Sequence, residues 1–125
     1  MVEKKTVMII DDDFLVAKSI SRYFNRDKFN TFVFGDGNSA LEWMGGQLPD
    51  LVILDVQMPD LDGFEVLGRI KQIKSDIPVI MVSGNLDDEK CQKLKKHGAN
   101  ACMEKPVDGT NLLFQVNQLI HLIQP

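Results

Sequence analysis

The chain has 125 residues, of which 44% are hydrophobic and 26% are charged, a balance typical of one folded domain rather than a disordered segment. Its formal net charge of −4 argues against the broad basic surface that direct binding to nucleic acid needs. It shows no apolar stretch of signal-peptide length at its start and no window near the ~18 apolar residues of a membrane span. We therefore expect a cytoplasmic protein with reduced thiols and no membrane insertion.

Short apolar runs recur along the chain, and each has the length of a β-strand. Residues 7–10, 51–54 and 79–82 are continuous apolar runs, which are typical of strands buried on both faces of a parallel sheet. Residues 31–34 and 101–103 are shorter or more polar candidates. The sequence therefore predicts five strands.

Segments with helical spacing lie between and after these strands. The apolar positions that define four of them are Val16, Ile20, Tyr23 and Phe24; Leu41 and Met44; Phe64, Leu67 and Ile70; and Leu112, Leu113, Val116, Leu119, Ile120 and Ile123. The remaining helix is indicated by acidic residues at 87–89 and basic residues at 93–97 before Gly98, an order that complements the helix dipole. The expected N-terminal caps are Asn38, Asp62 or Gly63, and Asp108.

The order of elements is a strand followed by a helix, repeated five times. Such alternation predicts the α/β class, with a five-stranded parallel sheet that is doubly wound, so that helices cover both faces. In sheets of this kind, sites form beyond the carboxyl ends of the strands, near the point where the strand order reverses.

Polar side chains are concentrated at those strand ends. Asp11 and Asp12 follow the first apolar run, Asp55 follows the third, Ser83 follows the fourth, and Lys105 follows the fifth. Clustered carboxylates repel one another, and Mg²⁺, which prefers oxygen ligands, is a suitable compensating ion. Because an aspartate can attack phosphorus and form an acyl phosphate, the pattern favours a phosphoryl-transfer site.

The segment from Asp55 to Gly63, with Met58-Pro59 inside it, resembles the phosphoacceptor segment of response-regulator receiver domains of two-component signalling. Asp11-Asp12, Ser83 and Lys105-Pro106 resemble the same family, in order and spacing over essentially the whole chain. The resemblance implies one flavodoxin-like receiver domain over residues 1–125, similar to chemotaxis regulators. It also implies a sensor histidine kinase or phosphotransfer protein as phosphodonor, and a downstream protein target or output domain.

The resemblance also assigns a metal-binding role to residues from two strand ends. Asp55 would be phosphorylated and would contact Mg²⁺. Asp12 would bind the ion directly, Asp11 would bind it directly or through water, and Gln57 would offer its backbone carbonyl. Asp13 is instead expected to be a solvated residue that starts a helix.

A second group would hold the phosphoryl oxygens. By the same resemblance, the Ser83 hydroxyl would donate to one oxygen and Lys105 would pair with another. Gly84 would leave room for the group, and a cis Lys105–Pro106 bond would aim the lysine inward. The domain would take part in its own phosphoryl transfer and autodephosphorylation without being an enzyme in the usual sense.

Two positions depart from the family pattern. The residue three positions before the lysine, often an aromatic ring that turns inward on phosphorylation, is Cys102, and the residue after Pro106 is Val107. We interpret Cys102 as a small buried hydrophobe and expect the signal to be transmitted by a loop and the fourth helix. Tyr23 and Trp43 are interpreted as packing residues.

Four other interpretations compete with this one. Each polar strand end alone is compatible with a helix cap or a turn residue. A phosphohydrolase with an aspartate nucleophile needs a second acid two residues on, where Gln57 stands. A phosphorylation-independent binding module would be expected to have lost members of the acidic set. A flavin-binding domain would need a phosphate-cradling loop where the aspartates stand.

Overall fold

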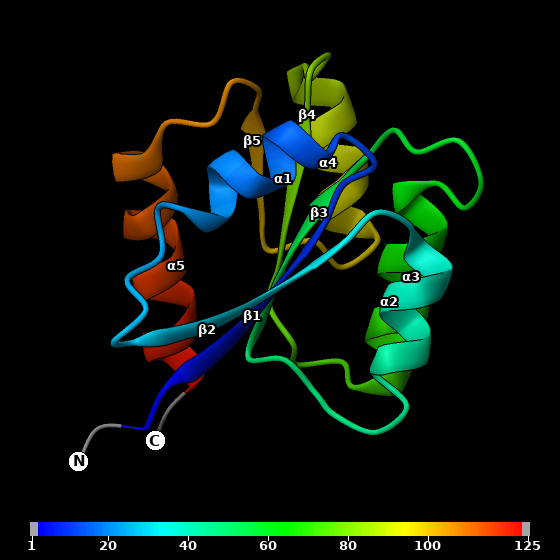
Figure 1. The fold of residues 1–125 in the computed structure, drawn as a ribbon. Helices are drawn as coiled ribbons and strands as arrows, with labels where there is room; N and C mark the ends of the chain where they lie inside the picture. Colours follow the sequence, from blue (N-terminus) through cyan, green and yellow to red (C-terminus); the bar gives the residue numbers. More distant parts are fainter. Residues whose placement is uncertain (1–2, 124–125) are drawn as a thin grey trace.

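Five parallel strands form one sheet over residues 3–123, the part of the chain that this computed structural model describes, with side chains as far as residue 120 (Figure 1). The strands are β1 Lys5–Ile10, β2 Phe29–Phe34, β3 Leu51–Asp55, β4 Val79–Ser83 and β5 Ala101–Glu104. The helices are α1 Phe14–Ser21, α2 Gly37–Trp43, α3 Gly63–Ile73, α4 Asp88–Lys96 and α5 Gly109–Ile123. The predicted α/β class and doubly wound parallel sheet are confirmed.

The sheet separates two apolar cores, because alternate residues of a strand point to opposite faces. On β1, Val7 and Ile9 pack with α1 and α5, whereas Met8 and Ile10 pack with α2, α3 and α4. Figure 1 shows the same division of helices between the two faces. All four of these side chains are fully buried, as the continuous apolar runs predicted.

The strand order is β2-β1-β3-β4-β5, so β2 is added on one side of β1 and the later strands are added on the other side. After β2 has paired on one side of β1, β3 pairs on the other side, with Ile10 opposite Phe34 and Leu54. The carboxyl ends of β1 and β3 therefore lie side by side at the switch point. This is where the fold class places a site.

The first helix is shorter than predicted. It ends at Ser21, and Tyr23 and Phe24 lie in a turn whose N–H groups bond three residues back, to Ile20 and Ser21. Phe24 is nevertheless buried and stacks edge-on with Phe29 at 5.1 Å between ring centroids. The apolar positions were correct, but the turn delivers Phe24 to the core without continuing the helix.

The predicted caps at Asp62 and Asp108 are confirmed, and the one at Asn38 is wrong. Asp62 accepts the N–H of Glu65 at 3.0 Å, and Asp108 accepts the N–H of Thr110 at 3.0 Å. The cap of α2 is Asp36, whose two oxygens accept the N–H of Ser39 at 2.7 Å and its hydroxyl at 2.9 Å, so this helix starts earlier.

The fourth helix has the predicted charge order, with Asp87 as its cap and Gly98 after it at a φ of 112°. The last predicted apolar position of α5, Ile123, has a side chain outside the described residues. Among the helices of residues 3–123, none is both long and apolar enough to cross a bilayer.

Gly63 allows the start of α3 to lie against the end of β3. Its N–H donates to the Val56 carbonyl at 2.9 Å, and a Cβ at this position would lie 2.5 Å from the Asp55 carbonyl oxygen. That oxygen belongs to the backbone and cannot move without displacing the strand end. A glycine at 63 is therefore a steric requirement of the loop that follows Asp55.

We expect Gly63→Ala to destabilise the protein by about 2–3 kcal/mol, because it forces a backbone overlap. The matched control is Gly68→Ala on the same helix, where a Cβ meets no atom within 4 Å. This change should stabilise by about 0.5–1 kcal/mol, since alanine is the better helix former. Urea unfolding of both variants measures the difference, and equal effects would contradict the steric argument.

Candidate functional site

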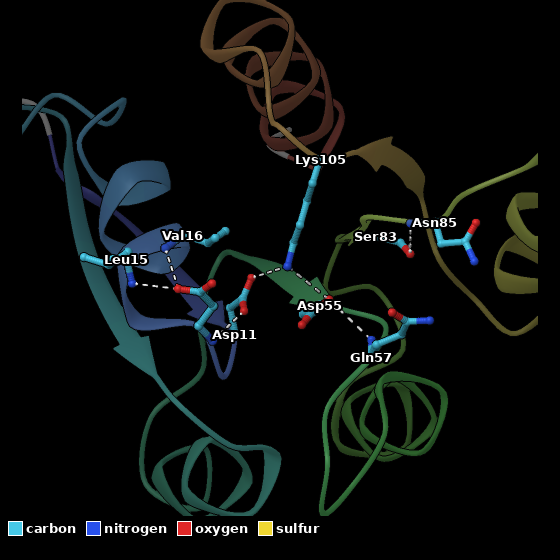
Figure 2. A network of polar contacts seen from close by, with 9 residues as sticks. Asp11, Leu15, Val16, Asp55, Gln57, Ser83, Asn85 and Lys105 are labelled. Carbon is cyan, nitrogen blue, oxygen red and sulfur yellow. Dashed lines mark hydrogen bonds and ion pairs between the residues drawn. The ribbon is translucent and has the colours of Figure 1, made fainter.

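The carboxyl ends of four strands deliver polar side chains to one rim of the sheet (Figure 2). Asp11 follows β1, Asp55 ends β3, Ser83 ends β4 and Lys105 follows β5. Asp11, Asp55 and Ser83 are 1%, 3% and 0% exposed, and they are the buried polar residues among those that the structure describes. Such groups need partners, because burying them unpaired is costly.

Lys105 supplies the positive charge for the two buried carboxylates. Its Nζ lies 2.9 Å from Asp11 Oδ2 and 3.4 Å from Asp55 Oδ1, and Figure 2 shows the side chain reaching between them. Burial by itself would lower the pKa of Lys105. The close contact with Asp11 and the charge of Asp55 outweigh this effect, so the pKa is raised and the ammonium stays charged.

Burial is the main cause that raises the pKa of Asp55 to about 6, and the neighbouring charge of Asp11 raises it further. Lys105 and the N–H of Gln57, which donates to Asp55 Oδ1 at 3.3 Å, act in the opposite direction. The ammonium and the N–H therefore do not offset the combined effect of burial and the Asp11 charge on the pKa of Asp55.

The acidic groups at this rim are arranged to hold a cation. Asp11, Asp12 and Asp55 each offer a carboxylate oxygen, and these oxygens lie within 4.8 Å of one another. Asp11 Oδ2 is buried and has the Lys105 ammonium as its close partner at 2.9 Å. An oxygen-only donor set of three carboxylates beside a single ammonium fits a hard divalent cation. The position of Gln57 in this set stays a prediction.

Asp13 is outside the acidic cluster. It is exposed and caps α1, where its Oδ1 accepts the N–H of Leu15 at 3.0 Å and of Val16 at 3.2 Å. Its own N–H donates to Asp11 Oδ1 at 2.9 Å. The predicted helix-start position of Asp13 is confirmed, and its backbone also helps to orient Asp11.

Ser83 lies at the same rim beyond Asp55, where its Oγ accepts the N–H of Asn85 at 3.1 Å (Figure 2). The Ser83 carbonyl accepts the N–H of Lys105 at 2.9 Å, which joins the ends of β4 and β5. A Cβ on Gly84 would meet no atom within 4 Å, so the rim is open here. The expected cis bond between Lys105 and Pro106 is present.

Two polar contacts around the rim were not anticipated from the sequence. The Tyr23 hydroxyl donates to the Val107 carbonyl at 3.3 Å, and Lys90 Nζ donates to the Asn85 carbonyl at 2.7 Å. Both acceptors are backbone carbonyls in loops, and the tyrosine contact spans 84 positions. Because any residue type has such a carbonyl, the sequence carries no signal for either contact.

Comparison with known proteins identifies relatives over nearly the whole chain. Residues 7–117 match the family described as the response regulator receiver domain. The chain is 33% identical to sporulation initiation phosphotransferase F of Bacillus subtilis, covering 82% of each protein. It is 32% identical to the transcriptional regulatory protein CseB of Streptomyces avermitilis, covering 96% of this chain but 51%, about half, of that protein.

The fold also matches that of solved receiver domains. The receiver domain of the Francisella response regulator 1452 superposes with a TM-score of 0.89 at 28% identity, covering 97% of this chain and 100% of that one.

We expect Asp55→Asn to stabilise the metal-free protein at pH 7.5 by about 4 °C or more in Tm, equivalent to ~1 kcal/mol. The pKa of Asp55 rises from 3.8 to about 6 on folding, so stability is lost as the pH rises through this interval. The advantage of the variant should therefore shrink at pH 4. Thermal unfolding at both pH values measures it, with exposed Asp60→Asn as the control. A variant less stable than the parent at pH 7.5 would contradict the electrostatic argument.

Proposed function

The chain belongs to the response regulator receiver domain family, and we propose that it is a phosphorylation-dependent switch whose phosphoacceptor is Asp55. The observation that carries the proposal is the placement of Lys105 Nζ between Asp11 Oδ2 and Asp55 Oδ1 at 2.9 and 3.4 Å. A fixed ammonium at a rim of buried carboxylates suits a group whose oxygens gain charge during transfer.

The proposed reaction moves a phosphoryl group from a phosphohistidine of a sensor kinase or phosphotransfer protein. A carboxylate oxygen of Asp55 attacks phosphorus, the phosphorus–nitrogen bond breaks, and its electron pair returns to the imidazole of the donor. The product on this chain is an acyl phosphate. Backbone donation from Gln57 to Asp55 Oδ1 and the position of Lys105 would hold the attacking group in place.

Asp11, Asp12 and Asp55 would hold Mg²⁺, with the Gln57 carbonyl as a further ligand. When bound, the ion would neutralise carboxylate and phosphoryl oxygens. The spacing of the three carboxylates and their oxygen-only chemistry support this assignment. Lys105 contacts two of the same residues, so the lysine and the ion would share the compensation of charge.

Ser83 would hydrogen-bond a phosphoryl oxygen. Its Oγ already accepts the N–H of Asn85, so the hydroxyl proton remains available for donation. The open space around Gly84 would accommodate the incoming group. Movement of the hydroxyl would weaken its bond to Asn85 and disturb the loop between β4 and α4.

The effect of phosphorylation at Asp55 would be transmitted through the loop between β4 and α4 and through α4 itself. Lys90 in α4 donates to the Asn85 carbonyl at 2.7 Å, which links the helix to the loop. Cys102 has no ring to move, and its Sγ donates to the Cys91 carbonyl of α4 at 3.6 Å. Burial raises the pKa of Cys102 to about 12, so the thiol stays neutral and acts as a packing group.

Incubation with acetyl phosphate and Mg²⁺ should add one acid-labile phosphoryl group, measured by intact mass. Asp55→Asn should abolish the gain, and Asp12→Asn should reduce its rate by about tenfold or more, because the cation set loses a charge. Asp13→Asn is the matched control, since asparagine also caps helices and residue 13 lies outside the cluster. No gain in the parent protein would contradict the assignment and favour a phosphorylation-independent module, whereas an equal gain in Asp55→Asn would place the phosphoryl group on another residue.

Addition of Mg²⁺ and beryllium fluoride, a phosphoryl mimic, should shift the amide resonances of residues 84–90 and of α4. The expected cause is the loss of the hydrogen bond from the Asn85 N–H to Ser83 Oγ. Lys90 would carry the resulting movement into α4, because its Nζ donates to the Asn85 carbonyl. Resonances of α2 should shift much less, because this helix packs against β1, β2 and α3. Unchanged shifts in α4 would exclude the proposed route while leaving the phosphorylation chemistry intact.

A further inference from the structure

Tyr23 connects the end of α1 to the loop that carries Lys105. It follows the last turn of α1, and its hydroxyl donates to the Val107 carbonyl at 3.3 Å. Its ring covers Gly109, the first residue of α5, so closely that a Cβ on this glycine would overlap the ring carbons. The glycine therefore provides the space that the tyrosine ring occupies.

The short segment from Lys105 to Val107 is held at both ends. At its start, the N–H of Lys105 donates to the Ser83 carbonyl at 2.9 Å. At its end, the Val107 carbonyl accepts the Tyr23 hydroxyl. With one end fixed to β4 and the other to Tyr23, the segment has little freedom to rotate the lysine away from Asp11 and Asp55.

The Val107 side chain also packs against the core covered by α1 and α5, whereas Lys105 lies beside open space. An open groove of about 440 Å³ lies between α1 and the β5–α5 loop, and Leu15, Tyr23, Lys105 and Val107 are among the residues that line it. The stem of Lys105 therefore borders open space on its α1 side. A long, flexible side chain beside a groove is oriented by its charge partners and by its backbone, and the Tyr23 contact constrains the backbone.

We propose that Tyr23 is a positioning residue for Lys105, acting through the Val107 carbonyl and the ring contact with Gly109. The inference rests on the proposed phosphoacceptor function. Tyr23 touches neither Asp55 nor the acidic cluster, so its loss should slow phosphoryl transfer without changing the affinity for Mg²⁺. The cation ligands come from the ends of β1 and β3, which the tyrosine does not hold.

The experiment compares Tyr23→Phe, which removes the hydroxyl alone, with Tyr23→Ala, which also removes the ring. The rate of Asp55 phosphorylation by acetyl phosphate is measured by intact mass, and Mg²⁺ affinity is measured by calorimetry. We expect a rate loss of about threefold for Tyr23→Phe, as for one neutral hydrogen bond, and about tenfold or more for Tyr23→Ala. Mg²⁺ affinity should stay within about twofold of the parent.

Lys71→Met controls for a simple loss of stability. Lys71 Nζ donates hydrogen bonds to the Ile77 carbonyl at 2.5 Å and to Asn100 Oδ1 at 3.1 Å. Both contacts lie at the end of the sheet opposite to the site. This variant should lower Tm and leave the phosphorylation rate unchanged. If Lys71→Met loses as much phosphorylation rate as the Tyr23 variants do at the same loss of Tm, the positioning role is overturned.

Gly109→Ala tests the ring contact independently, because it should displace the ring while Tyr23 is still present. It should slow phosphorylation in the parent but have little effect in Tyr23→Ala, where no ring remains to be displaced. Equal effects in both backgrounds, or a parent rate in Tyr23→Phe and Tyr23→Ala, would overturn the inference. A parent protein that takes up no phosphoryl group would instead refute the proposed function.

Discussion

The placement of one ammonium group between two buried carboxylates is the constraint on which the site depends. Asp11 and Asp55 lie at the carboxyl ends of the neighbouring strands β1 and β3, and both side chains are buried. Lys105 reaches both, but its one positive charge does not offset burial and the charge of Asp11, which together raise the pKa of Asp55. The cluster of carboxylates is therefore suited to a cation.

The surrounding backbone is shaped to keep this arrangement in place. Asp11 is oriented by the N–H of Asp13 and Asp55 by the N–H of Gln57, each from the loop that follows its own strand. Gly63 lets the second of these loops close against the strand end. The site is thus built from short loops on rigid strands, which fixes charged groups better than mobile segments do.

Much of the fold and of the candidate site could be predicted from local patterns. The strands and most helix limits followed from apolar runs and capping residues, because burial and unsatisfied N–H groups act locally. The errors arose where two local signals competed. The apolar periodicity suggested a helix through Tyr23 and Phe24, but a turn delivers Phe24 to the same core. Asn38 and Asp36 are both capable caps, and Asp36 makes two hydrogen bonds to Ser39.

The set of residues that gather at the rim follows from the sequence alone. Parallel strands with apolar interiors have only their ends for polar groups, and parallel pairing aligns those ends. How these groups meet depends on the tertiary structure: Lys105 spans Asp11 and Asp55, and the Tyr23 hydroxyl donates to the Val107 carbonyl. Such contacts join residues far apart in the chain, often through backbone atoms that every residue type shares, so no pattern of side chains can specify them.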